Sequence, residues 1–368
     1  MHHSVFFQRP ARALWHTCLL ASALASTGGH ATEVPPTGLV FGPYKHLLTH
    51  VDPRDPQARI RTTGTPQRLA DATPAALLPG SNNVTLAFAS GECGQERWTA
   101  RDATVLHSDG SSTVEPLALD AASVVRANLA NLHAAGYRYT ISTGGEGNLF
   151  TCASDAGMDA FIARYDGPGL LGFDFDIEHT QTLDNIQSLV ARIKVAQAKR
   201  PTLRWSFTLP TFAASDASRA SLNPLGLQTL AAIRAAGLDT FIINLMVMDY
   251  GKASPAACVV RDGRCDMAAS AIQAARNLHT VHGVPMHHIA LTPMIGVNDV
   301  VENVFTPEDA VALARFARVE QLAGLHFWSL DRDTPCPGGA TAVSPTCSSL
   351  NAHPALAFSR AFAQGLRP

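Results

Sequence analysis

The chain has 368 residues, a formal net charge of −2 at neutral pH and 46% hydrophobic residues, which suits one large α/β domain. A slightly acidic sequence without a basic cluster argues against nucleic acid or an anionic membrane surface as a partner.

The first 31 residues are expected to form an export signal. Arg9 and Arg12 precede an apolar run, which is followed by small residues and by two positions suited to cleavage, after Ala25 and after Ala31. The apolar run is too short to span a bilayer, and no later stretch approaches it in length. We therefore predict a secreted protein, extracellular or periplasmic, whose mature part (32–368) does not associate with a membrane.

Apolar, β-rich segments recur along the mature chain and predict eight strands. They lie at 39–48, 84–89, 137–143, 170–178, 203–209, 240–250, 289–295 and 325–330. Helical spacing is found between most of them, at 121–135, 185–199, 225–236, 268–281 and 307–322. Thr306 and Pro307 predict the start of the last of these helices, as cap and first residue. The segment 50–80 is rich in Pro, Thr and Arg and is expected to be a long surface loop.

Eight strands separated by helices fit a (β/α)8 TIM barrel better than a doubly wound sheet. A doubly wound sheet would place a glycine-rich phosphate loop after its first strand, and none is present there. No segment resembles a linker, and 298–324 has room for one helix but not for an inserted subdomain. We therefore predict a single barrel domain over 32–368, with its chemistry at the C-terminal ends of the strands.

The end of the fourth expected strand carries three acids in alternation with apolar residues. Asp174, Asp176 and Glu178 share one face of an extended chain, and the other face carries two Phe and one Ile. Neighbouring carboxylates raise one another's pKa, and acids with separated pKa values suit general acid–base chemistry. A half-exposed strand with an acidic outer face would instead intersperse Lys, Thr or Ser. A metal site is disfavoured, because one strand spreads the carboxylates too far apart for one cation and no His completes the set.

Further motifs lie at the ends of the other expected strands. They read STGG at 142–145, NLMVMDYG at 244–251, TPMIGVND at 292–299 and FWSLDRD at 327–333, with a Cys93–Trp98 loop after the second strand. Together with 172–178, they resemble the glycoside hydrolase family 18 chitinases. The family signature DGxDxDxE is matched except at Leu171, which replaces the first Asp. STGG matches the family's SxGG motif, and the others are similar to one bacterial branch.

The resemblance implies an endo-acting chitinase that hydrolyses β-1,4 bonds between N-acetylglucosamine units. In this family the 2-acetamido oxygen of the substrate attacks the anomeric carbon, so the configuration is retained. Glu178 would act as general acid and then as base. Asp176 would share a proton with Asp174 and then turn toward Glu178 and the acetamido N–H. Chitin or chito-oligosaccharides are the implied partner of a monomer, and no cofactor or metal is implied.

Two other functions remain open. An endo-β-N-acetylglucosaminidase would keep the mechanism and act on the core of N-glycans. An inactive chitin-binding lectin would keep the barrel, but such proteins usually lose the terminal acid of the signature, and Glu178 is present.

The resemblance also implies substrate contacts at the strand ends. Trp328 would form the apolar floor under the sugar at the cleavage position, and Asp249 would lie near its acetamido group. Met248 replaces the family's Tyr, whose hydroxyl is then either missing or supplied by Tyr250. Gly144 and Gly145 would leave room for sugar by lacking side chains. The remaining expected contacts are Asn244, Met246 and Trp98.

Other charged residues near these motifs are expected to have supporting roles. Glu146 is interpreted as a solvated loop acid. The ion-paired supports are expected to be Asp299, Asp331, Arg332 and Asp333.

Six cysteines remain once Cys18 is removed with the signal, and an even number in an exported protein suggests disulfides. Sequence alone allows many pairings. With the strands assigned as above, Cys93–Cys152 would join loops after neighbouring strands, while Cys258–Cys265 and Cys336–Cys347 would each close one loop. These bridges would stiffen the rim of the cleft. A zinc site is disfavoured, because there is no CxxC pair and no His at ligand spacing.

Overall fold

A computed structural model describes residues 38–61, 66–109, 111–178, 181–218 and 221–368. The expected export signal lies outside the described residues. Within the described part of the chain, the helices are too short or too polar to cross a membrane.

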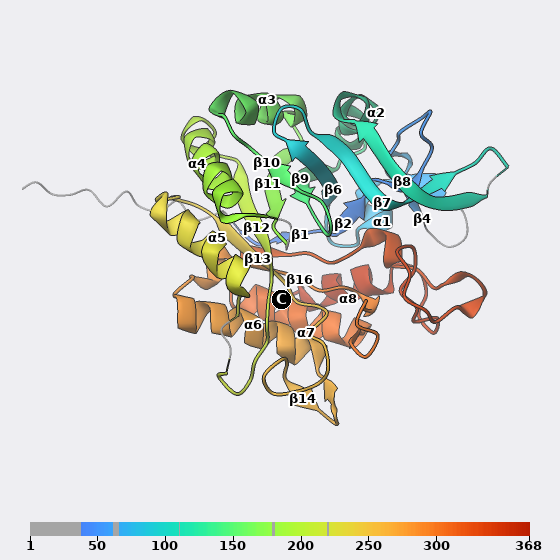
Figure 1. The fold of residues 1–368 in the computed structure, drawn as a ribbon. Helices are drawn as coiled ribbons and strands as arrows, with labels where there is room; N and C mark the ends of the chain where they lie inside the picture. The colour runs from blue at the N-terminus through green and yellow to red at the C-terminus, as the bar shows by residue number, and fades with distance from the viewer. Residues whose placement is uncertain (1–37, 62–65, 110, 179–180, 219–220) are drawn as a thin grey trace, which may run out of the picture. The chain divides into compact units, whose positions relative to one another are not determined.

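Parallel strands at eight positions form a strongly curled sheet whose two ends meet (Figure 1). The first position is divided: β1 (Val40–Phe41) pairs with β19 (Gly324–Leu325), and β2 (Tyr44–His46) pairs with β6 (Asn83–Glu92). The remaining positions follow in chain order as β9 (Arg138–Gly144), β11 (Leu170–Asp176), β12 (Arg204–Pro210), β13 (Ile242–Met246) and β16 (Ile289–Thr292). This arrangement is a TIM-like α/β fold, as the sequence predicted.

Helices lie outside this sheet, between successive strands (Figure 1). They are α1 (Pro74–Leu77), α2 (Ala121–Ala134), α3 (Asp155–Tyr165), α4 (Leu183–Lys199), α5 (Pro224–Ala235), α6 (Met267–His282), α7 (Pro307–Val319) and α8 (Ala357–Gly365). The predicted cap of α7 is present: the Thr306 hydroxyl accepts from Asp309 N at 3.2 Å, and the Asp309 carboxylate accepts from Thr306 N at 2.8 Å. This reciprocal pair satisfies two backbone donors and begins the helix at Pro307.

The prediction of a long surface loop over 50–80 is wrong. This part of the chain contains α1, strand β4 (Arg59–Arg61), strand β5 (Pro66–Arg68) and the 3-10 turn η1 (Leu69–Asp71), and β3 (Thr49–Val51) ends within it. Ile60, Leu69 and Leu78 are buried in the core. Isolated apolar residues among Pro and Thr gave no periodic signal, although tertiary packing buries them.

A long antiparallel hairpin was also not predicted. β7 (Arg97–Leu106) and β8 (Ser112–Asp120) follow the second barrel strand, and β7 pairs with both β6 and β3. Shorter elements complete the fold: β10 (Phe150–Thr151), β14 (Val260–Arg261), β15 (Arg264–Cys265), β17 (Gly296–Val297), β18 (Val304–Phe305), η2 (Met286–His288), η3 (Leu330–Arg332) and η4 (Pro337–Gly339).

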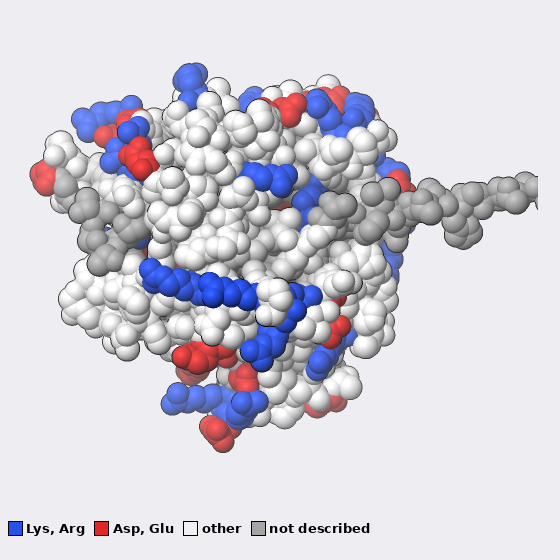
Figure 2. Space-filling view, turned by 180° about the vertical axis from the view of Figure 1, so that it is seen from behind, with Lys and Arg blue, Asp and Glu red and all other residues white. Residues whose placement is uncertain are grey.

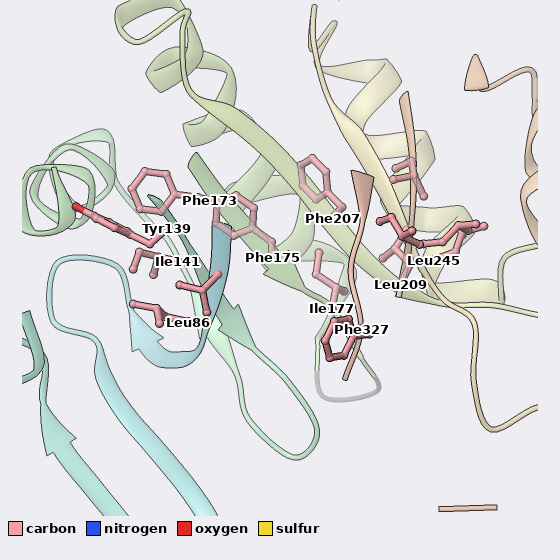
Figure 3. Packing of buried hydrophobic residues seen from close by; sticks show 14 of the residues in the cluster. Leu86, Tyr139, Ile141, Phe173, Phe175, Ile177, Phe207, Leu209, Leu245 and Phe327 are labelled. Carbon is pink, nitrogen blue, oxygen red and sulfur yellow. The ribbon is translucent and has the colours of Figure 1, made fainter. Parts of the chain in front are cut away.

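The two faces of β11 carry different chemistry, as the alternation predicted. Phe173, Phe175 and Ile177 are almost completely buried in the layer between sheet and helices (Figure 3). The ring of Phe173 lies 4.9 Å from that of Phe161 on α3. The opposite face therefore directs Asp174 and Asp176 into the barrel interior.

All three expected disulfides are present, joining Cys93 to Cys152, Cys258 to Cys265 and Cys336 to Cys347.

The molecular surface carries charges of both signs. Seen from behind, Lys and Arg side chains are interspersed with Asp and Glu apart from one row of basic residues (Figure 2).

Candidate active site

A cavity of about 430 Å³ opens at the C-terminal ends of the barrel strands. Among the described residues, the side chains that line it include five carboxyl groups and no Lys, Arg or His. The carboxyl groups belong to Glu146, Asp176, Glu178, Asp249 and Asp299. Aromatic and thioether groups form much of the remaining wall, from Tyr44, Phe88, Phe212, Trp328, Met246, Met248 and Met294.

Asp174 lies below the cavity and is held by four hydroxyl groups. The hydroxyl of Tyr44 donates to its Oδ2 at 2.9 Å and that of Ser142 at 2.7 Å, while Ser206 and Thr208 donate to Oδ1 at 2.5 and 2.7 Å. Burial raises the pKa of Asp174, and the hydroxyl hydrogen bonds oppose that increase. This network fixes the position of Asp174 and the base of the site.

Asp176 is in a different environment, although it is only two residues further along β11. It lines the cavity, is 6% exposed, and its Oδ1 is buried without a hydrogen-bond partner. Burial raises the pKa of Asp176 well above its usual range, and the charges of Glu178 and Asp174 raise it further. Asp176 therefore favours the protonated state, in which it can donate a hydrogen bond to a neighbouring acceptor.

Glu178 follows the end of β11 and is half-buried at the cavity. Burial raises its pKa to about 7, and the charge of Glu146 contributes second. A carboxyl group with this pKa can both donate and accept a proton near neutral pH.

Glu146 is exposed on the loop after β9, as expected, but it also lines the cavity. Asp299, between β17 and β18, lines the cavity as well, and so it is not simply an internal support. The sequence did not predict that either residue lines the cavity, because their positions depend on the course of two loops.

Asp249 lines the cavity from the loop after β13. Its Oδ1 accepts a hydrogen bond from Val300 N at 2.8 Å, which ties this loop to the one after β16. Burial raises the pKa of Asp249, and the bond from Val300 opposes the increase. Met246 and Met248 also line the cavity, whereas the hydroxyl of Tyr250 is buried without a partner and Tyr250 does not line it.

Asn244 points into the barrel interior, as its position along β13 predicted, but lies below the cavity lining. Its Nδ2 donates to Thr208 Oγ1 at 2.8 Å and to Tyr44 Oη at 3.0 Å, and its Oδ1 accepts from Thr292 Oγ1 at 2.9 Å. Asn244 thus extends the polar network around Asp174 instead of facing the cavity.

Trp328 and Phe88 form an aromatic wall. Their ring centroids are 5.5 Å apart with planes 18° from parallel, and both residues line the cavity. Phe88 was not anticipated, because nothing distinguishes it from the core residues of the same strand. Its position depends on Gly145: a Cβ there would lie 2.8 Å from the Phe88 ring, and the Gly145 φ is +80°.

Gly144 and Trp98, the other glycine and tryptophan expected to face the substrate, instead contribute to packing inside the protein. A Cβ at Gly144 would lie 2.1 Å from the carbonyl oxygen of Asp176, so the missing side chain admits the backbone of β11. Trp98 is fully buried, and its indole Nε1 donates to Tyr165 Oη at 3.2 Å. The expectation that Trp98 contacts substrate is therefore not met, because its ring packs toward α3.

The charged residues after β19 are buried and make hydrogen bonds or ion pairs within the protein. Lys45 Nζ lies 2.7 Å from Asp331 Oδ1, and both side chains are fully buried. Arg332 donates to the backbone carbonyls of Ile295 and Val297 at 2.9 and 2.6 Å. Asp333 accepts from Phe358 N at 3.0 Å, at the start of α8.

One group of described residues has the spacing of metal ligands: Glu92, Cys93 and Cys152. The two cysteines are joined in a disulfide, so they offer no thiolate.

Comparisons with known proteins give a consistent result. No protein-family model matches the chain. A protein of Escherichia coli described as a probable bifunctional chitinase/lysozyme is 30% identical over 260 residues, or 63% of this chain and 27% of that protein. Endochitinase 11 of Metarhizium anisopliae is 29% identical over 225 residues, or 55% of this chain and 41% of that protein. The chain thus spans less than half the length of these curated relatives.

The fold is similar to that of solved chitinases. The catalytic domain of a hyperthermophilic chitinase from Pyrococcus furiosus is 25% identical, with a TM-score of 0.62, over 89% of this chain and 95% of that domain. Catalytic-site mutants of active domain 2 of a thermostable chitinase from the same organism, complexed with chito-oligosaccharides, share the fold with a TM-score of 0.60 at 24% identity. Sequence similarity, fold and the acids at the end of β11 agree, and all three make the chain similar to the chitinases of glycoside hydrolase family 18.

Proposed function

We propose that this chain is a chitinase that cuts β-1,4 bonds inside N-acetylglucosamine polymers and retains the anomeric configuration. The observation that carries this proposal is the position of Glu178, a carboxyl group with a pKa of about 7 at the cavity, beside the buried and unpaired oxygen of Asp176. The relatives whose names describe chitinases support the choice of substrate.

In the first step, protonated Glu178 donates its proton to the oxygen of the bond that breaks. The 2-acetamido oxygen of the same sugar attacks the anomeric carbon, and the leaving chain departs with the donated proton. Asp176, once its proton has passed to Asp174, accepts a hydrogen bond from the acetamido N–H, and its negative charge stabilises the cyclic oxazolinium ion, while four hydroxyl groups hold Asp174 in place. In the second step, Glu178 accepts a proton from water, which opens the ring from the opposite face.

The sugar at the cleavage position would pack its C–H face on Trp328, and Asp249 would lie beside its acetamido group. Met248 lines the cavity where the family's Tyr is expected, and Tyr250 offers no hydroxyl there. Tyr44 brings a hydroxyl group to the cavity from the first barrel strand, but that group donates to Asp174.

We also propose that residues 32–368 act as a single, monomeric catalytic domain outside the cytoplasm. Support comes from the three disulfides, because such bridges persist in oxidising compartments.

Product analysis on chitohexaose and on a high-mannose glycoprotein, run side by side, tests the proposed substrate. We expect shorter chito-oligosaccharides from the first and no released glycan from the second. Glu178→Gln should lose at least about 100-fold in turnover, the usual contribution of general acid–base catalysis, with its circular dichroism spectrum unchanged. Release of the glycan with intact chitohexaose would favour the endo-β-N-acetylglucosaminidase, and near-normal turnover of Glu178→Gln would refute the acid assignment.

A further inference from the structure

A second cavity, also of about 430 Å³, adjoins the first. The two cavities form parts of one groove, because they share the lining residues Phe88, Glu146, Met294, Asp299 and Trp328. Asp176, Glu178 and Asp249 line the first cavity and not the second. The second cavity therefore lies beyond Trp328 from the acid that protonates the leaving oxygen. This is the side on which the sugar before the cleavage position, toward the non-reducing end, would bind.

The far wall of the second cavity is held by covalent and hydrogen bonds. It is built by β7, through Asp102, and by the loop that the Cys336–Cys347 disulfide closes, through Ser344. The Arg332 guanidinium, which is 1% exposed, donates to the backbone carbonyl of Ser344 and to two carbonyls in the segment after β16. The cavity is thus formed by the protein alone, and little ordering is needed to fill it.

His46, at the end of β2, lines the second cavity and backs the aromatic wall. Its ring centroid lies 5.9 Å from that of Trp328 and 6.1 Å from that of Phe88. Its backbone N donates to Asp331 Oδ2 at 3.1 Å, and its ring Nδ1 lies 3.1 Å from Thr49 Oγ1. These contacts fix the orientation of the imidazole.

The other ring nitrogen of His46 is left for a ligand. Thr49 engages Nδ1, and among the described residues no hydrogen bond uses Nε2. Unlike the ring nitrogens of His50, which are buried without a partner, Nε2 is not a buried atom, so it is open to the cavity. Burial and then the charge of Lys45 lower the pKa of His46 to about 4, against the opposing charge of Asp102. The imidazole is therefore neutral near neutral pH.

This combination matches the chemistry of a pyranose. One face of the sugar is apolar and suits an indole, while its edge carries hydroxyl and acetamido groups that need polar partners. We propose that His46 binds the sugar next to the one that is cut, on its non-reducing side, through a hydrogen bond between Nε2 and a hydroxyl or acetamido group. Binding energy from this neighbouring sugar would hold the cleaved sugar over Trp328. The inference rests on the proposed function.

Three substitutions separate the contributions of the ring and its two nitrogens. His46→Asn keeps an amide near the place of Nδ1, His46→Gln places an amide near that of Nε2, and His46→Phe keeps a ring without nitrogen. We expect kcat/KM for a fluorogenic chitobioside to fall roughly two- to tenfold in His46→Asn and His46→Phe, the contribution of one neutral hydrogen bond. His46→Gln should recover most of this loss, and circular dichroism spectra should be unchanged throughout.

Two inhibitors identify which sugar His46 contacts. A one-sugar thiazoline mimics the cyclic intermediate and fills the cleavage position, whereas the thiazoline of chitobiose also reaches the second cavity. His46→Asn should raise the inhibition constant of the two-sugar compound by the same roughly two- to tenfold factor and leave that of the one-sugar compound unchanged.

His279→Asn is the matched control. The Nδ1 of His279 lies 2.9 Å from the carbonyl oxygen of Val284, and this residue of α6 is not among the described residues that line either cavity. The substitution should change neither inhibition constant.

The outcomes distinguish this inference from the function on which it rests. Full activity of His46→Asn or His46→Phe, equal losses in all three His46 variants, or equal weakening of both thiazolines would overturn the inference alone. No cleavage of the chitobioside by the unchanged protein would overturn the proposed function.

Discussion

Asp174 and Asp176 lie two residues apart on β11, but their surroundings differ. Asp174 is held by four hydroxyl groups, while Asp176 is buried with an oxygen that has no partner. Alternation alone predicted that both lie on the face of the strand opposite the apolar residues, and that prediction is confirmed. The inward position of two hydroxyl donors could also be predicted from the sequence, because Ser206 and Thr208 alternate with apolar residues on β12. The role of Tyr44 could not be predicted, since it depends on the register between strands that are distant in the sequence.

Activity should fall as the pH rises through the pKa of Glu178. That pKa is raised to about 7, and the acid must be protonated to act, so the alkaline limb of kcat/KM should lie near this pH. Glu146→Gln removes a negative charge near Glu178, lowers the pKa and should move the limb to lower pH. The measurement is kcat/KM for a soluble chito-oligosaccharide across pH, with Glu115→Gln, a change at an exposed acid on β8, as the control. A limb that stays in place in Glu146→Gln would contradict this coupling.

Gly145→Ala should weaken substrate binding by displacing Phe88 from the aromatic wall. A Cβ at this position would lie 2.8 Å from the Phe88 ring, whereas one at Gly283 would meet nothing within 4 Å. Both glycines have positive φ, at +80° and +65°, so Gly283→Ala has the backbone strain without the clash. We expect a higher KM in Gly145→Ala only. An equal increase in KM in both variants would mean that backbone strain, and not the position of Phe88, weakens substrate binding.

At the scale of elements, the barrel strands were predictable because each is a short apolar segment. The ends of the strands were less predictable. Residues 240–250 were expected to be extended, but β13 covers only Ile242–Met246, and the cavity residues Met248 and Asp249 follow it. α3 was missed although Met158, Phe161, Ile162 and Tyr165 have helical spacing. The β7–β8 hairpin was missed because β8 is mostly exposed and β7 mixes buried with exposed residues, so neither strand is a continuous apolar segment.

The buried ion pair between Lys45 and Asp331 links β2 to η3. Lys45→Met would leave the Asp331 carboxylate buried without a cation, which typically costs roughly 3–5 kcal/mol in the free energy of unfolding. Lys45→Met with Asp331→Asn should recover much of that loss, since no isolated charge remains. Denaturant unfolding measures both.

The matched control for this pair is Lys194→Met, which breaks an exposed pair with Asp239. Its cost should be below about 1 kcal/mol. Equal losses in Lys45→Met and Lys194→Met would show that burial of the Lys45 pair does not determine its contribution.

At the scale of the whole molecule, sequence predicted the architecture and the disulfides but not the groove. The alternation of strands and helices fixes which loops gather at one end of a barrel, and so the acids, Trp328 and Asp249 could be placed together. The second cavity depends on a hairpin and on a disulfide-closed loop whose courses no local pattern specifies. For the same reason Trp98 was expected in the groove, whereas it packs against Tyr165 in the core.

The stereochemistry of cleavage tests the central claim most directly, because it separates attack by the substrate's own acetamido group from direct attack by water. Proton NMR of freshly cleaved chitotetraose, recorded before mutarotation, identifies the anomer that forms first. The account predicts the β anomer, together with no cleavage of fully deacetylated chitosan or of cello-oligosaccharides, which lack the attacking group. An α anomer as the first product, or comparable cleavage of cello-oligosaccharides, would contradict it.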